Sequence, residues 1–166
     1  MMIHTHRFYL RELQVNDVTD RYVNWLKDKT IRQYIEARFD LNQLKQYVKE
    51  KTLKRDVLFL GIFDKSSGEH VGNIKYEPVN PDLGFAVMGI LIGQPEWRGK
   101  GVAAEVIKAS AELLVNTRQI KKIILGVDRR NTMAINAYVK IGFTEQHTEF
   151  IRDISVNGMT MVWDLT

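Results

Sequence analysis

Apolar side chains recur along the chain with two periods, which divide it into strand-like and helix-like segments. Apolar runs of strand length predict seven strands, at residues 8–13, 57–63, 70–77, 83–92, 121–127, 143–152 and 157–165. Helical spacing of apolar residues predicts helices at residues 18–26, 30–35, 41–48, 102–115 and 131–141. This order favours one α/β (α+β) domain over residues 1–166, with a mixed sheet of about seven strands and two crossover helices.

Residues at the segment boundaries refine this pattern. Asn16 or Asp17 is expected to cap the first helix and Asn131 the last, because a short polar side chain there accepts a hydrogen bond from the first turn. Gly142 is expected to end the last helix. Two prolines within four residues predict a loop at residues 78–82, since proline is disfavoured in a central strand.

Composition narrows the class of protein. With 166 residues, 45% apolar and 27% charged, the chain has the make-up of a globular domain with a sizeable core. It contains no cysteine, which excludes a disulfide scaffold, a thiol nucleophile and a thiolate metal site. The longest apolar run, residues 83–93, is too short to span a bilayer, and the N-terminus lacks the apolar segment of a signal peptide. We therefore expect a cytoplasmic protein with no membrane partner.

The charge distribution favours a small anionic ligand over nucleic acid. The formal net charge is +4 and the pI is near 9.3. This mild excess suits a phosphorylated cofactor, whereas nucleic-acid binding is typical of basic stripes with interleaved aromatic residues, which the sequence does not show. The four histidines are scattered without the spacing of metal ligands, so no metal is expected.

A glycine-rich turn at residues 94–103, Gln-Pro-Glu-Trp-Arg-Gly-Lys-Gly-Val-Ala, joins an apolar strand to a helix. Such a junction presents several main-chain N–H groups to a phosphate. Gly99 and Gly101 permit a tight turn, and Arg98 and Lys100 add positive charge. The turn lacks the third glycine of the dinucleotide fingerprint and the Gly-Lys-Ser/Thr of a Walker A loop. By itself it is either a phosphate-binding loop or a tight turn with solvated charges.

A second segment adds weight to the phosphate-binding interpretation. Residues 131–143 follow a strand and carry the pattern N-x-x-A-x-x-x-Y-x-x-x-G-F. Together the two segments make the chain resemble the GNAT superfamily of acetyl-CoA-dependent N-acetyltransferases, most specifically over residues 83–143. The resemblance implies an acyltransferase with acetyl-CoA as cofactor, built on a mixed, mostly antiparallel central sheet flanked by helices.

The resemblance also assigns residues to the cofactor. The glycine turn would be the pyrophosphate loop of coenzyme A, and the pantetheine arm would pair with the end of the preceding strand, whose N–H groups can polarise the thioester carbonyl. Glu96 departs from the family, which has Gln or Arg there, and we expect its carboxylate to point away from the pyrophosphate. The expected cofactor-binding residues are Ile90, Leu91, Ile92, Arg98, Gly99, Lys100, Gly101, Val102, Ala103, Asn131, Ala134 and Tyr138.

Catalytic roles follow from the same resemblance. Tyr138 matches the family's general acid for the departing thiolate, although spacing alone would favour a core aromatic. The strand before the loop carries no carboxylate where several family members place a glutamate. The candidate general bases are therefore Glu77 and Glu36, with a water relayed by main-chain carbonyls as the alternative.

The implied reaction is direct acetyl transfer to a primary amine. The N-terminal segments resemble two branches of the family. One branch acetylates the N-termini of ribosomal proteins, and the other acetylates nucleotide-linked amino sugars. A homodimer is common in the family. The alternative function is a non-catalytic acyl-CoA-binding module, which would not need Tyr138.

Overall fold

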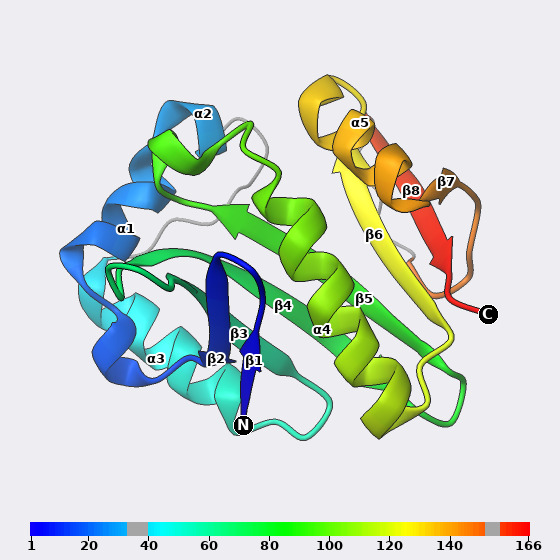
Figure 1. The fold of residues 1–166 in the computed structure, drawn as a ribbon, viewed down its shortest axis with the longest axis horizontal. Helices are drawn as coiled ribbons and strands as arrows, with labels where there is room; N and C mark the ends of the chain where they lie inside the picture. The colour runs from blue at the N-terminus through cyan, green and yellow to red at the C-terminus, as the bar shows by residue number, and fades with distance from the viewer. Residues whose placement is uncertain (33–39, 152–156) are drawn as a thin grey trace.

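The computed structural model describes residues 1–32, 40–151 and 157–166, and within these ranges the chain forms an eight-stranded sheet covered by helices (Figure 1). The strands are β1 (Met2–His4), β2 (Phe8–Glu12), β3 (Leu58–Asp64), β4 (His70–Asn80), β5 (Phe85–Ile92), β6 (Lys122–Asp128), β7 (Thr144–Glu145) and β8 (Gly158–Asp164). The α-helices are α1 (Asp20–Lys27), α2 (Lys29–Arg32), α3 (Leu41–Thr52), α4 (Val102–Arg118) and α5 (Thr132–Ile141), and 3-10 helices form at Val15–Asp17 and Pro95–Trp97.

The sheet is mixed and mostly antiparallel, as predicted. Its order is β1-β2-β3-β4-β5-β6-β8-β7, and β5 and β6 form its parallel pair. α4 connects these two strands, since parallel neighbours need a crossover connection. The strand beyond the predicted seven is β1, whose three residues are too few to produce a detectable apolar period.

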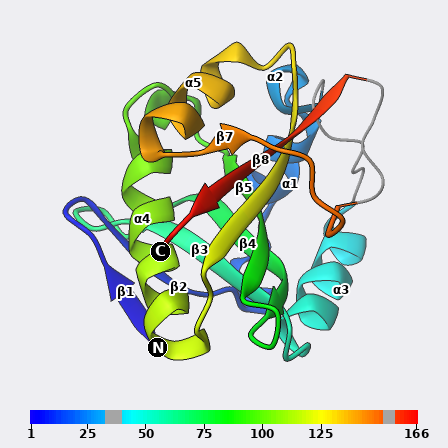
Figure 2. The same cartoon turned by 90° about the vertical axis from the view of Figure 1, so that its right-hand side faces the viewer.

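The sheet separates the two larger of three apolar clusters in the described part of the chain. α4 and α5 lie on one face, while α1 and α3 lie on the other (Figure 2). Because successive side chains of a strand point to opposite faces, β4 presents different residues to the two sides of the sheet. Ile74 and Tyr76 are fully buried under α4, whereas Asn73 and Lys75 face the α1 and α3 side. The polar side chains of β4 therefore gather on the α1 and α3 face.

The prediction of a loop at residues 78–82 is wrong in its first part, because β4 continues through Pro78 to Asn80. The register between β4 and β5 shifts between Tyr76 and Val79. Pro78 thus lies in a bulge, where the ladder needs no N–H donor.

Two other boundaries differ from the prediction. A 3-10 turn occupies Val15–Asp17, and α1 begins only at Asp20 with Thr19 at its N-cap position. The Asp17 carboxylate accepts hydrogen bonds from the Arg11 guanidinium, at 2.8 Å, and from the Gln14 main-chain N–H, at 2.7 Å, so it caps the 3-10 turn and not α1. At the other end of the chain, β7 keeps only two residues of the strand predicted over residues 143–152; residue 152 lies outside the described part, as do residues 33–35 of the helix predicted at 30–35.

The C-terminal helix agrees with its predicted boundaries. The Asn131 side chain accepts a hydrogen bond from the Ala134 N–H at 3.3 Å, and Gly142 ends α5 with a φ of 131°. In the part of the chain that the structure describes, no helix is both long and apolar enough to cross a membrane.

Candidate active site

The central feature of the site is a separation between β5 and β6. The two strands pair only from Phe85–Val87 to Lys122–Ile124 and then diverge toward their carboxyl ends (Figure 1). Gly89–Ile92 keep pairing with β4 on their other side. This leaves one edge of β5 without a strand neighbour among the described residues, which is where an extended ligand can add main-chain hydrogen bonds.

The glycine turn lies at the carboxyl end of this open strand. Gly99 and Gly101 adopt φ values of 69° and 77°, which side chains other than glycine rarely tolerate. A Cβ built on Gly99 would meet no atom within 4 Å, so the outer side of the turn is open. Val102 and Ala103 begin α4, whose first N–H groups have no intrahelical acceptor. Open space, turn geometry and a helix N-terminus together fit the diphosphate of coenzyme A.

Arg98 has a different part in the turn from the one expected. Its guanidinium donates to the main-chain oxygens of Ile92 (3.1 Å) and Gly93 (2.9 Å) and to the Asp28 carboxylate (3.1 Å). The side chain therefore holds the turn against the end of β5 and the end of α1. Lys100 is exposed and remains available to a phosphate.

Glu96 is exposed, and its carboxylate accepts a hydrogen bond from the Gln94 side chain at 3.2 Å. Gln94 in turn accepts from the Trp25 indole N–H at 2.9 Å. The Trp25 ring packs so tightly on the backbone that a Cβ on Gly93 would lie 1.9 Å from it. α1 thereby fixes the start of the turn through a contact that no local sequence pattern indicates.

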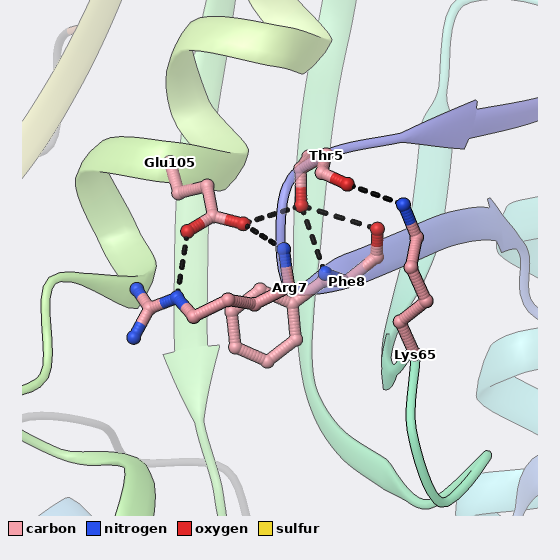
Figure 3. Close-up of polar contacts among 5 residues, drawn as sticks. All are labelled: Thr5, Arg7, Phe8, Lys65 and Glu105. Carbon is pink, nitrogen blue, oxygen red and sulfur yellow. Dashed lines mark hydrogen bonds and ion pairs between the residues drawn. The ribbon is translucent and has the colours of Figure 1, made fainter.

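Arg7 is a cation at the turn that the sequence does not predict (Figure 3). Its Nε and main-chain N–H donate to the Glu105 carboxylate, each at 2.8 Å, and the Thr5 hydroxyl donates to the same carboxylate at 2.5 Å. A Cβ on Gly101 would lie 3.7 Å from Arg7 Nη2, so the guanidinium stands beside the turn. Arg7 and Glu105 are 98 positions apart, and only the fold brings them together.

Tyr138 lies on α5 in the cluster between α4 and the sheet, and it is 9% exposed. Its hydroxyl has no hydrogen-bond partner within residues 1–32, 40–151 and 157–166. Burial raises the pKa of Tyr138 to about 12. The phenol is therefore protonated at neutral pH and able to donate its proton. Asn131 and Ala134 are joined by the helix cap, as described above.

A pocket of about 280 Å³ opens on the other face of the sheet. β5 contributes Gly89, Ile90 and Leu91, and β4 contributes Asn73 and Lys75. The remaining walls are aromatic and aliphatic side chains from α1, α3 and β3, namely Tyr22, Leu26, Leu44, Tyr47 and Phe59. The open strand thus borders the pocket and leads into the glycine turn.

Glu77 does not line this pocket. Its carboxylate accepts a hydrogen bond from the Lys51 ammonium, and its second oxygen is 3.7 Å from Lys75 Nζ. Burial alone would raise the pKa of Glu77, but the hydrogen bond from Lys51 and the charges of Lys75, Lys51 and Lys54 outweigh it and lower the pKa below its ordinary value. A carboxylate held in this way is a poor proton acceptor near neutral pH, so its geometry does not favour Glu77 as general base. Glu36, the other candidate, lies outside the described residues.

Comparison with known proteins shows which family this chain belongs to. The sequence profile described as "Acetyltransferase (GNAT) domain" matches residues 7–144. The spermidine N(1)-acetyltransferase of Escherichia coli K12 is 28% identical over 160 residues, covering 92% of this chain and 81% of that protein.

Solved structures share the fold. An acetyltransferase (GNAT family) from Bacillus anthracis superposes with a TM-score of 0.82 at 16% identity, covering 99% of both chains. Spermidine N-acetyltransferase from Vibrio cholerae, in complex with CoA and spermine, superposes with a TM-score of 0.81 at 21% identity, covering 96% of both chains. The profile match spans most of the sequence, and the chain belongs to the GNAT acetyltransferases, which depend on acetyl-CoA.

Proposed function

We propose that this acetyltransferase transfers the acetyl group directly from acetyl-CoA to a primary amine held in the pocket between α1, α3 and the sheet. The observation that carries the proposal is the position of Gly89–Leu91. These residues line the pocket, belong to the open edge of β5 and lead into the glycine turn. A cofactor anchored at the turn and extended along β5 would reach the pocket. The absence of cysteine from the sequence supports direct transfer over a thiol-bound acetyl group.

The chain's own groups fit each requirement of the reaction. Acetyl-CoA supplies the activated thioester when it is bound. Ile90, Leu91 and Ile92 offer main-chain groups to the pantetheine arm and to the thioester oxygen. The diphosphate binds to the glycine turn and the start of α4, at Gly99, Lys100, Gly101, Val102 and Ala103. Arg98 fixes the turn through its hydrogen bond to the main-chain oxygen of Gly93. Tyr138 donates its proton to the departing sulfur.

We assign loss of the acceptor's proton to water or to Glu36 rather than to Glu77. The ion pairs of Glu77 lower its pKa and hold it outside the pocket walls. The variant Glu77→Gln tests this directly. We expect its pH–rate profile to keep the wild-type acid limb, whereas a shifted or flattened acid limb would restore Glu77 as the base.

The acceptor is a primary amine. The resemblance of the N-terminal segments offers two candidates for it: a nucleotide-linked amino sugar and a protein N-terminus. Two of the relatives named above, from Escherichia coli and Vibrio cholerae, are spermidine acetyltransferases, which makes spermidine a third candidate. A homodimer is a further part of the proposal, to be measured by light scattering. The alternative function, a non-catalytic acyl-CoA-binding module, would bind the cofactor without turnover.

The test is release of free CoA from acetyl-CoA in the presence of an amine panel. It includes amino sugars, peptides with free N-termini, spermidine and amino acids, and the acetylated product is identified by mass spectrometry. Amine-dependent CoA release with an N-acetyl product supports the transferase. Tight acetyl-CoA binding without release for any amine would favour the binding module instead.

A further inference from the structure

We propose that the acceptor carries an anionic oxygen group, a phosphate or a carboxylate, that binds Lys75 and the Asn73 amide in the pocket. This inference rests on the proposed transferase function and adds the chemical class of its substrate. It separates this chain from an enzyme built for polyamines, whose charges are all positive.

The first support is the charge of the pocket. Lys75 is the only charged side chain among the described residues that line it. Its Nζ donates to the Tyr47 hydroxyl at 2.6 Å and lies 5.3 Å from the centre of the Tyr47 ring. The ammonium also lies 5.7 Å from the Phe59 ring centre, and the side chain is 28% exposed. Aromatic neighbours thus hold a partly desolvated cation at the pocket wall.

The cation is only partly neutralised, because Glu77 divides its charge between Lys75 and Lys51. Glu77 is the carboxylate near Lys75, but it accepts its hydrogen bond from Lys51, and the charge of Lys54 also acts on it. Asp56 is the other acidic group of this cluster, through its charge on Lys51. Three lysines and two carboxylates leave a net positive charge beside the pocket. A polycationic acceptor would be repelled here, and an anion would be attracted.

The second support is an unsatisfied donor. Asn73 is 3% exposed, and its side-chain oxygen is 2.7 Å from His70 Nε2. Its amide nitrogen is buried and makes no hydrogen bond of good geometry among the described residues, although Asn73 interacts more weakly with the side chain of Tyr22, which also lines the pocket. Buried donors are rarely left unpaired in folded proteins, so an acceptor oxygen is the expected partner. Asn73 and Lys75 are two positions apart on β4, so the amide and the ammonium face the same side of the sheet.

The strand register places this polar wall opposite the cofactor strand. Lys75 pairs with Gly89 and Asn73 with Leu91, so both polar residues sit directly across from the open segment of β5. A Cβ on Gly89 would meet no atom within 4 Å, which leaves room beside Lys75. An amine bound for transfer at β5 can therefore place an acidic group against β4 within the same pocket.

The experiment compares kcat/KM for matched amines. Glucosamine 6-phosphate against glucosamine forms the phosphate arm, β-alanine against β-alaninamide forms the carboxylate arm, and spermidine represents polycations. We expect the anionic member of at least one pair to exceed its neutral partner by about 10-fold or more, as a charged hydrogen bond would give. Spermidine should be the poorest substrate. Preference for the neutral members or for spermidine would overturn the inference.

Two lysine variants locate the effect. Lys75→Gln should abolish the preference for the anionic member, and Lys54→Gln should keep it, because Lys54 acts on the same Glu77 only through its charge and does not line the pocket. An equal effect of both variants would reduce the preference to a general field and overturn the role of Lys75. An unchanged acetyl-CoA thermal shift in both variants verifies that the fold is retained.

Binding separates this inference from the proposed function. Calorimetry titrates the same amines into the CoA complex of the wild type and of Lys75→Gln. If no amine is acetylated, the transferase proposal fails. Lys75-dependent binding of an anionic amine would then still support the anionic pocket, and its absence would overturn it.

Discussion

At the scale of single residues, a substitution at Tyr138 can test the catalytic role of the hydroxyl without changing how the ring packs. Its ring belongs to the core, while its protonated hydroxyl has no partner in the described part of the chain. Tyr138→Phe keeps the ring and removes the proton. We expect kcat to fall about 100-fold, the size typical of general acid catalysis, with little change in acetyl-CoA affinity. Steady-state kinetics and calorimetry measure the two effects.

A matched control is Tyr76→Phe. Tyr76 is fully buried in the same cluster, where its hydroxyl lies 2.8 Å from the Ser110 hydroxyl. Loss of that hydroxyl should affect stability and leave kcat close to wild type. If the Tyr138→Phe enzyme keeps the wild-type kcat, Tyr138 is not the general acid and its role is only to pack in the core.

Arg7 gives a second prediction at this scale. Because its guanidinium stands beside Gly101, Arg7→Gln should weaken acetyl-CoA binding by about 10-fold, as expected for a lost charged contact to a phosphate. S-acetylpantetheine, which lacks the diphosphate, should bind both proteins equally. Arg11→Gln is the control, since Arg11 lies on β2, four residues after Arg7, but pairs with Asp17 away from the turn. Equal weakening by both arginine variants would argue against an Arg7–phosphate contact.

These residues also show what a sequence can reveal about a site. Gly99, Gly101 and Asn131 are predictable, because a turn and a helix cap depend on neighbours a few positions away. Arg7, Asn73 and Lys75 are not, because their roles come from contacts or register positions set by distant strands. Arg98 illustrates the same limit: its charge is visible in the sequence, but the oxygens that orient its side chain are not.

At the scale of elements, the hairpin of β1 and β2 is fastened to the first turn of α4 by Glu105 (Figure 3). Burial opposes ionisation of Glu105, but hydrogen bonds from Thr5 and Arg7 outweigh it and lower its pKa below the ordinary 4.5. A lowered carboxylate pKa contributes stability at neutral pH and loses it as pH falls below about 4.5. Glu105→Gln should remove this contribution.

Chemical denaturation between pH 7 and pH 3.5 measures the effect. Glu105→Gln should be less stable than wild type by about 1–2 kcal/mol at pH 7, with the difference shrinking toward pH 3.5. Glu112→Gln serves as the control, because Glu112 is exposed on the same helix. A pH-independent difference would show that the carboxylate charge of Glu105 does not matter.

Apolar periodicity predicts the central elements well and the edges poorly. α4 and α5 each bury one face, and β5 and β6 are nearly continuous apolar runs, so these apolar patterns identify them. β1 and β7 are short edge strands, and the end of β4 depends on a bulge against β5. The separation of β5 from β6 is invisible to periodicity, because it lies between two strands that each show a normal apolar pattern.

At the scale of the whole molecule, the turn, the open edge of β5 and α5 meet only in the folded chain, so acetyl-CoA should bind the native state alone. Ligand at 100 times its Kd then stabilises the protein by about 2.7 kcal/mol. For a chain of this length each kcal/mol raises Tm by roughly 2–4 °C, which gives a shift of roughly 5–10 °C. Gly101→Glu places bulk and negative charge in the turn at a φ of 77°, and it should abolish the shift whatever its own Tm. Differential scanning calorimetry measures both. A wild-type Tm that is independent of saturating acetyl-CoA would contradict the assignment of the turn, whereas a full shift in Gly101→Glu would move the diphosphate site elsewhere in the molecule.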